Sequence, residues 1–318
     1  MQHDGDGRFD PLGCALVIAS ALLYSTLGIF GKFAYQEGLS VPSLLSTRFT
    51  IAAVLLGAFV ALSPRMRRGL RALSSRRLAA VFLWGAFGFG GQSALFFTTL
   101  SHISAGLSVL LLYTCPAFLA IIVWLRTGRR PAAARLAAIA LALAGTWLCA
   151  GPIDGVVSPQ GVALGVATGL CFAVFLLGLH RVNAGVPAVL SAALIAAGAA
   201  CAFDAWVVIR GDYILPPTRL AWAAVLGMVI CATIAGFVLL VVGMRRVGPQ
   251  VTSVLSTFEP VGALLLAALL LGERLRGTQW FGAALIIGAA FTLAAPPRVA
   301  LTPPGGEDRI GTYQPDTD

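Results

Sequence analysis

The sequence predicts an all-α integral membrane protein, with ten transmembrane helices arranged as two inverted repeats of five helices each. Three observations carry this prediction. The chain of 318 residues is 58% hydrophobic and only 11% charged, whereas a soluble domain carries about 25% charged residues. Apolar stretches long enough to cross a bilayer recur along the chain, and features of its first half return in the second. This composition excludes an ordinary water-soluble enzyme, a disordered chain and a nucleic-acid-binding protein.

A transmembrane helix needs about 20 predominantly apolar residues, because the hydrocarbon core is about 30 Å thick. The stretches that satisfy this requirement are Leu12–Ala34, Pro42–Leu62, Leu78–Leu100, Ala105–Leu125, Ala132–Gly151, Gln160–His180, Pro187–Val208, Leu220–Met244, Pro249–Leu271 and Thr278–Ala295. The polar segment 101–104 divides the long apolar run between the third and fourth stretches, and we expect a tight hairpin there.

The arginine residues predict the orientation, because cytoplasmic loops of membrane proteins are enriched in Lys and Arg. With the N-terminus inside, most arginines fall in the inner loops. The two richest loops hold Arg65, Arg67, Arg68, Arg71, Arg76 and Arg77, and Arg126, Arg129, Arg130 and Arg135. An even number of crossings then returns the C-terminus to the cytoplasm. The tail of residues 297–318, rich in Pro, Gly and Asp, is expected to be flexible.

Two sequence offsets indicate an internal repeat. An offset of 144 residues aligns Pro116 with Pro260 and Gly128 with Gly272, and an offset of 148 aligns Pro11 with Pro159. We therefore predict a first repeat over residues 1–151 and a second over residues 152–296. Because five is an odd number, the second repeat enters the membrane in the opposite orientation. This is the plan of many secondary transporters, whose substrate site lies near the midplane between the repeats.

Glu259 is the first candidate for a functional residue, because an acid in mid-span costs about 2.5–3.5 kcal/mol on insertion scales and marks a functional site by default. We expect it to contribute to substrate binding and to carry a coupled proton. Ser256 lies on the same helix face, and Pro260 removes a backbone hydrogen bond and breaks the helix, as does Pro116 in the first repeat. The alternative is a structural acid that is hydrogen-bonded to a neighbouring helix.

Other polar and aromatic residues in mid-span are candidates for lining a substrate pocket, since pockets combine an apolar wall with a few orienting polar groups. They are Tyr24, Thr26, Gln92, Tyr113 and Thr114. For each aromatic residue, ordinary helix packing is the alternative interpretation.

Further basic residues and glycines lie within or at the ends of the spans. Lys32 is either an anion partner in the outer mouth or an interfacial lysine. Arg48 either binds a carboxylate in bidentate fashion or pairs with Asp204 or Glu37. His102 and His180 stand at span ends and are expected to be interfacial. The glycines at positions 161, 165 and 169 form two GxxxG steps, which we interpret as packing within the chain.

The strongest motif is Arg246-Val247-Gly248-Pro249, followed by Ser253 to Pro260 and by Leu271-Gly272-Glu273. With Ser104 to Leu107, Pro116 and Gly128 in the first half, it resembles the signature of the drug/metabolite transporter superfamily, EamA type. The resemblance covers residues 12–295. It implies two inverted five-helix halves in a bacterial-type inner (plasma) membrane, and transport of small metabolites such as amino acids, sugars or purines. The sequence departs from symmetry at Cys115, which stands where the second half has Glu259, and at Arg129, which stands opposite Glu273.

These features together predict a secondary active transporter of a small, amino-acid-like metabolite. We expect an exporter that works by alternating access, with proton coupling as a hypothesis. The alternative is a membrane receptor or scaffold subunit that binds a ligand without moving it. An enzyme is not expected, because the sequence contains neither HExxH nor GxSxG. No cofactor, metal or nucleic acid is expected either, and the choice between a monomer and a homodimer stays open.

Overall fold

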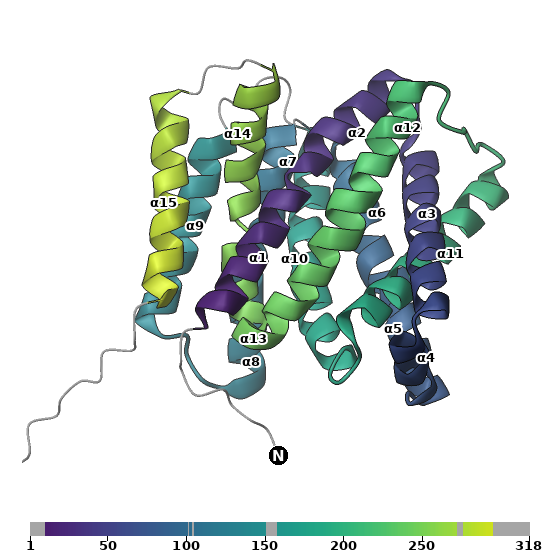
Figure 1. Cartoon of the computed structure of the whole chain (residues 1–318). Coiled ribbons are helices and arrows are strands. Elements are labelled where there is room, and N and C mark those ends of the chain that lie inside the picture. Colours follow the sequence, from purple (N-terminus) through teal and green to yellow (C-terminus); the bar gives the residue numbers. More distant parts are fainter. Residues whose placement is uncertain (1–9, 101, 104, 151–157, 272–275, 295–318) are drawn as a thin grey trace, which may run out of the picture.

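A computed structural model describes residues 10–100, 102–103, 105–150, 158–271 and 276–294. Within these ranges the regular structure is entirely helical, and most helices run roughly along one common direction (Figure 1). The elements are α1 (Pro11–Tyr24), α2 (Thr26–Gln36), α3 (Val41–Leu62), α4 (Pro64–Arg71), α5 (Ser75–Leu83), η1 (Trp84–Gly90), α6 (Gly91–Leu100), α7 (Ala105–Leu112), α8 (Cys115–Thr127), α9 (Ala133–Ala150), α10 (Pro159–Val182), α11 (Ala188–Arg210), α12 (Arg219–Gly227), η2 (Met228–Gly236), α13 (Phe237–Leu255), α14 (Phe258–Leu271) and α15 (Gly277–Ala294).

The helices have the length and composition of membrane spans. Among the described residues, eight helical segments are long and apolar enough to cross a bilayer, and Gly277–Leu293 forms a shorter apolar helix. One of the eight, Arg219–Leu255, is 37 residues long. It bends at Gly248, whose φ of 77° and ψ of 165° are not helical. A positive φ is accessible to glycine at little cost. The bend falls between the eighth and ninth predicted stretches, directly before Pro249.

Several local features were not predicted from the sequence. The first span divides into α1 and α2 at Ser25, and the third and eighth predicted stretches each contain a π-helix, η1 and η2. These π-helices begin at Trp84 and Met228, which are related by the same offset as Pro116 and Pro260. The predicted hairpin at 101–104 lies partly outside the described residues, and the tail of residues 297–318 lies wholly outside them.

The beginnings of α1 and α10 follow one local pattern. A side chain caps each helix, from Asp10 in α1 and Ser158 in α10, and a proline occupies the first turn. The cap accepts the backbone N–H of Gly13 in α1 and of Gly161 in α10. The first four N–H groups of a helix lack helical partners, so such caps stabilise the start. This shared pattern stands at the offset that aligns Pro11 with Pro159 in the sequence.

Glycines allow the helices to pack closely. A Cβ added at Gly145 of α9 would lie 2.7 Å from the carbonyl oxygen of Gly282 of α15, and these helices run side by side in Figure 1. The Gly161, Gly165 and Gly169 stripe of α10 faces α7, the 102–103 segment and Thr114, which confirms the predicted packing within the chain. Close backbone approach through small residues is the usual basis of helix association in membranes.

The packed centre of the molecule is aromatic. The Phe49 ring stacks on Phe203 with centroids 5.7 Å apart, and Phe89 contacts Phe49, Phe175 and Phe237 at centroid distances of 5.4, 5.3 and 5.2 Å. These rings come from α3, η1, α10, α11 and α13. Such ring pairs add about 0.5–1.5 kcal/mol beyond their area burial. Two of the rings, Phe89 and Phe175, also line the cavity described next.

Candidate substrate site

A cavity lies in the middle of the helix bundle, where helices from both predicted repeats meet; it comprises about 670 Å³ of empty space, including space open to the surroundings. Its lining consists of Ser20, Ala21, Tyr24, Leu27, Arg48, Phe89, Gln92, Ser93, Phe96, Phe97, Leu112, Tyr113, Phe172, Phe175, Leu240, Ser256 and Glu259. Among these described residues, Glu259 is the only acid and Arg48 the only base. The wall is otherwise apolar and aromatic, with a few hydroxyl and amide groups, which is the composition of a small-molecule site.

Two interrupted helices bring Glu259 and Tyr113 together. Helix α7 ends at Leu112 and α8 begins at Cys115, while α13 ends at Leu255 and α14 begins at Phe258. Across these breaks, the Tyr113 hydroxyl donates a 2.6 Å hydrogen bond to Glu259 Oε2. Both breaks precede a proline, as predicted for Pro116 and Pro260. Because Glu259 is bonded to a neighbouring helix and also lines the cavity, its structural and functional interpretations are compatible.

A second cavity meets the first at Glu259. It comprises about 1210 Å³, including space open to the surroundings, and shares Leu27, Phe96, Phe97 and Glu259 with the first cavity. Its other lining residues include Tyr35, Gln36 and Leu100, at the C-terminal ends of α2 and α6. The two cavities therefore adjoin at these shared residues, and the second extends toward the end of the bundle where α2 ends.

Only 2% of the surface of Arg48 is exposed, and the residue lines the central cavity. Its Nε donates a 2.7 Å hydrogen bond to Thr233 Oγ1, and its guanidinium carbon lies 4.9 Å from the Phe49 ring centroid. The suggested pairing with Asp204 or Glu37 is wrong. Asp204 instead accepts hydrogen bonds from Ser46 and Thr50, and Glu37 accepts one from Thr218.

Two tyrosine hydroxyls in these cavities are buried without a hydrogen-bond partner among the described residues. They belong to Tyr24, which lines the central cavity, and Tyr35, which lines the second. A buried hydroxyl left unpaired costs roughly 1–3 kcal/mol. Both groups are therefore available to a bound solute or to water.

Five of the seven predicted pocket residues line the central cavity, namely Tyr24, Gln92, Tyr113, Ser256 and Glu259. Thr26 and Thr114 do not appear in the lining formed by the described residues. Each instead donates to a backbone carbonyl three residues earlier in its own chain segment, at Leu23 and Leu111.

The remaining candidates lie away from the cavity. His102 and His180 stand at the ends of α6 and α10, as expected, and His180 is exposed. The side chain of Lys32 lies outside the part of the chain that the structure describes. Within the described ranges, no group of three or more His, Cys, Asp or Glu side chains is placed to hold a metal ion.

Sequence reasoning missed Ser20 and the five phenylalanines that line the cavity. The only signal for the rings was their abundance in apolar stretches, where a packing residue and a pocket residue look alike. The break at Ser25 also lacked a signal, because no proline follows it.

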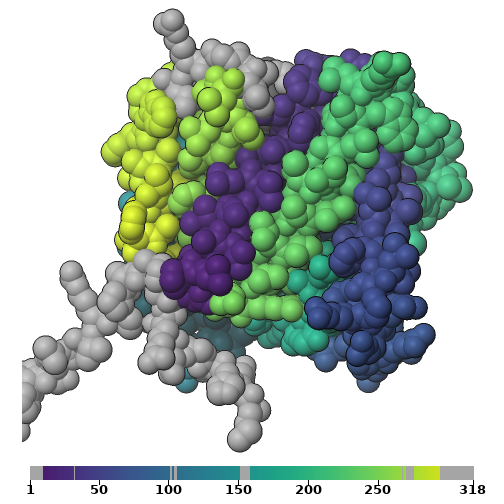
Figure 2. Space-filling model, viewed as in Figure 1, coloured from purple at the N-terminus to yellow at the C-terminus, as the bar shows by residue number. Residues whose placement is uncertain are grey.

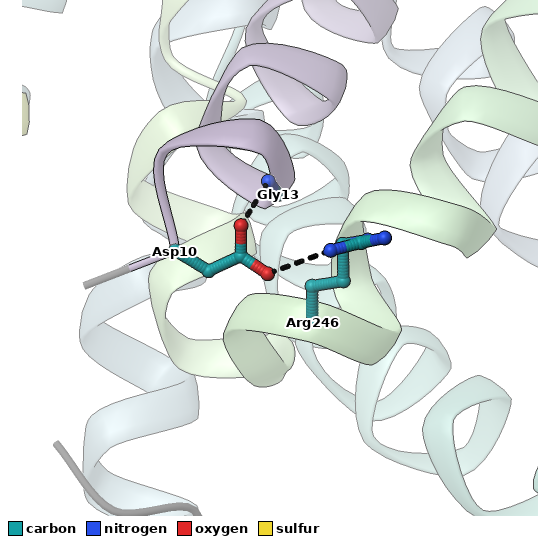
Figure 3. A network of polar contacts seen from close by, with 3 residues as sticks. All are labelled: Asp10, Gly13 and Arg246. Carbon is teal, nitrogen blue, oxygen red and sulfur yellow. Dashed lines mark hydrogen bonds and ion pairs between the residues drawn. The ribbon is translucent and has the colours of Figure 1, made fainter. Parts of the chain in front are cut away.

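Helix α1 packs against α13, and the two lie side by side on the face shown in Figure 2. Figure 3 shows Asp10 at the start of α1 accepting the Gly13 N–H at 3.0 Å and pairing with Arg246 of α13 at 3.0 Å. The Gly13 N–H and the Arg246 guanidinium lower the pKa of the Asp10 carboxyl below its ordinary value. This ion pair joins the two predicted repeats at the end that the arginine distribution assigns to the cytoplasm.

Both halves of the chain match one known protein family. The EamA-like transporter family matches the chain twice, over residues 11–151 and 159–295. The chain belongs to the EamA-like transporter family, within the drug/metabolite transporter superfamily. It is thus an all-helical membrane protein with two EamA domains and a transporter rather than an enzyme. The two EamA domains meet at the Tyr113–Glu259 hydrogen bond.

Relatives of this EamA protein include bacterial transporters. The threonine/homoserine exporter RhtA of Salmonella typhimurium strain LT2 is 28% identical over 260 residues, which is 78% of this chain and 80% of RhtA. The uncharacterised transporter YwfM of Bacillus subtilis strain 168 is 28% identical over 208 residues, which is 64% of this chain and 69% of YwfM. The fold is similar to that of a protein in a solved crystal structure, with a TM-score of 0.70 and 24% sequence identity. The match covers 88% of this chain and 95% of the other chain.

Proposed function

We propose that this EamA protein is a secondary active transporter that exports a small amino-acid-like metabolite by alternating access. The observation that carries the proposal is the central cavity, in which Tyr113 of the first EamA domain hydrogen-bonds Glu259 of the second. A receptor or scaffold would also need a ligand pocket. It would not need the pocket at a contact between two repeated domains, where a relative motion of the domains can expose it to either side.

In this proposal, ten spans form two inverted halves, residues 1–151 and 152–296, with both termini on the cytoplasmic side of an inner (plasma) membrane. Three features support the repeat. The two π-helices begin at positions that the first sequence offset aligns, the capped starts of α1 and α10 stand at positions that the second aligns, and both proline breaks flank the cavity. Discontinuous helices at the midplane are typical of transporter substrate sites.

Glu259 couples export to proton entry through competition for one carboxylate. Among the described lining residues it is the only acid, so a substrate ammonium group and a proton cannot both neutralise it. The site then opens to the other side of the membrane only when Glu259 is neutralised, either by the substrate or by a proton. Under that condition, one proton enters for each substrate molecule that leaves. The energy then comes from a gradient, which agrees with the absence of an ATP-binding loop motif from the sequence.

Export as the direction, and an amino acid as the substrate class, draw support from the name of RhtA, a threonine/homoserine exporter. That relative is only 28% identical. The particular amino acid must therefore be inferred from the cavity of this chain.

The test uses purified protein in proteoliposomes and a panel of isotope-labelled amino acids. Wild-type protein should accumulate one or more of them against their gradient when a pH gradient is imposed, and should also exchange internal for external substrate. Glu259→Gln should abolish the pH-driven accumulation while retaining exchange. Asp204→Asn is the matched control, because Asp204 is bonded to Ser46 and Thr50 and does not line the central cavity. Undiminished uphill transport by Glu259→Gln would refute the coupling role, and binding without any transport would favour the receptor.

A further inference from the structure

Arg48 carries a buried positive charge that no acid in the described part of the chain neutralises. The one ion pair found among the described residues joins Arg246 to Asp10, at the surface. Removing an ion from water without a partner is expensive, so buried charges are normally paired or ligand-bound. The Thr233 hydroxyl and the Phe49 ring satisfy only part of the guanidinium. The two terminal nitrogens make no hydrogen bond to any described residue and are left for the cavity that Arg48 lines.

The position of Arg48 along the bundle places this charge deep in the membrane. Its partner Thr233 lies in η2, near the middle of the helical stretch between Arg219 and the bend at Gly248. An arginine near a helix end can extend its head group to the interface. Arg48 does not do so, because its Nε is bonded at the level of η2 and its side chain is almost fully buried.

We infer that Arg48 binds the carboxylate of the transported solute, while Glu259 binds its ammonium group, so that the central cavity recognises a zwitterionic amino acid. The inference rests on the proposed function and names the substrate class of the same site. A planar guanidinium with two free nitrogens matches the two oxygens of a carboxylate. Glu259 accepts the Tyr113 hydroxyl at Oε2, and its Oε1 is bonded to no described donor.

The rest of the cavity selects the side chain of that amino acid. Apart from its polar groups, the wall consists mainly of Phe89, Phe96, Phe97, Phe172 and Phe175, with Leu27, Leu112 and Leu240. An apolar side chain gains about 25 cal/mol per Å² of surface removed from water on entering such a wall. We therefore expect leucine to bind more tightly than threonine, although a relative is a threonine/homoserine exporter.

The test measures binding rather than transport, by calorimetry on the purified full-length chain in detergent. The probes are leucine, leucinamide, which lacks the carboxylate, 4-methylpentanoate, which lacks the amine, and threonine. Leucine should bind, and removing either charged group should weaken binding at least about 10-fold, the effect of one charge-assisted hydrogen bond. Threonine should bind more weakly than leucine.

Arg48→Met separates a binding role from a structural one. The Thr233 hydroxyl keeps its hydrogen bond to the Met228 carbonyl, so the substitution leaves no orphaned group there, and replacing a buried charge by an apolar residue is often neutral or stabilising. The thermal stability of the ligand-free variant should therefore equal or exceed that of wild type. Leucine should bind at least about 10-fold more weakly to it, and no better than leucinamide. Arg48→Lys should be intermediate, since lysine is a single point charge.

The outcomes distinguish this inference from the proposed function. Leucine binding that depends on both charged groups and on Arg48, without transport in proteoliposomes, would retain the inference and refute the transporter proposal. Equal affinities for leucine and leucinamide, or unchanged selectivity in Arg48→Met, would overturn the inference even if transport is observed. Absence of binding by any probe to folded wild-type protein would overturn it as well.

Discussion

The contact between α1 and α13 should behave as a gate, and substituting Gly243 should open it. Gly243 lies on α13 where it meets the first turns of α1. A Cβ added there would lie 2.7 Å from Val17 Cγ2 and 3.0 Å from the carbonyl oxygen of Gly13. The contact lies near the start of α1, where Asp10 pairs with Arg246 of α13 (Figure 3). Alternating access requires the contact to separate in the other conformation.

The expected size of the effect follows from the crowding at Gly243. Val17 is fully buried and its γ-methyl groups are close to the backbone, so it cannot swing aside to accommodate an added methyl group. Overpacking of this kind costs about 1–3 kcal/mol. If only the closed state makes the contact, Gly243→Ala shifts the equilibrium toward the open state by that amount, which is about 5- to 150-fold.

Cys14 provides a natural reporter for this shift. It packs with Val17 and Leu255 in a small buried cluster at the same end of the bundle. In a protein that retains Cys14 and has serine or alanine at the other five cysteine positions, the rate of reaction with a polar maleimide measures the opening of that end. Gly243→Ala should raise the rate about 5- to 150-fold. Saturating substrate should change the rate in both proteins, because binding redistributes the conformations.

Gly145→Ala is the matched control for general destabilisation. A Cβ at Gly145 would also lie 2.7 Å from its nearest neighbours, the carbonyl oxygen of Gly282 and Ile286 Cγ1, but between α9 and α15, away from the cavity. It should lower the melting temperature without changing Cys14 labelling. If Gly243→Ala lowers the melting temperature equally and leaves Cys14 unreactive, the contact is ordinary packing and the reasoning fails.

Two further predictions concern stability. Because the pKa of Asp10 is lowered, its carboxylate stabilises the fold at neutral pH and loses this effect as the pH falls below about 4. Thermal unfolding at several pH values should therefore show that Asp10→Asn is less stable than wild type at pH 7 and that the difference disappears at acidic pH. A difference that does not change with pH would contradict this. At Gly198 a Cβ would overlap the carbonyl oxygen of Phe82, so Gly198→Ala should cost at least about 1–3 kcal/mol in thermal unfolding, whereas Gly57→Ala, which meets open space, should cost nothing.

The span boundaries could be predicted from the sequence because they depend on hydropathy and on prolines and glycines at fixed positions. Gly248 and Pro249, for example, separate two predicted stretches, and the structure bends there. The π-helices could not be predicted, because their residues are as apolar as those of the α-helices around them and the wider turn depends on neighbouring helices. The offset that relates Pro116 to Pro260 also aligns Trp84 with Met228, two residues with no chemical likeness.

The candidate site was predictable where a residue is chemically unusual for a membrane. Glu259 and Tyr113 met this condition, and their hydrogen bond spans two helices that the repeat offset had already related. For Arg48, the alternative of a pair with Asp204 or Glu37 is wrong, since Asp204 accepts hydrogen bonds from the hydroxyls of Ser46 and Thr50 and Glu37 accepts one from Thr218. Hydroxyl groups are common on every helix, so no sequence pattern shows which of them an acid will use.

The asymmetry of the two charged residues bears on how binding could drive the motion. Cys115 occupies the position of Glu259 in the first half, and Arg48 corresponds to Ala192 or Ala196 in the second half at the two offsets. Each half therefore contributes one charge to the cavity, of opposite sign. A solute with only one charged group engages one half, whereas a zwitterion engages both and draws them together through the same bound molecule. Because a ligand can shift a conformational equilibrium only by its difference in affinity for the two states, a solute held by both halves has the larger effect on their relative motion. Specificity for a zwitterion and coupling between the halves then arise from the same pair of residues.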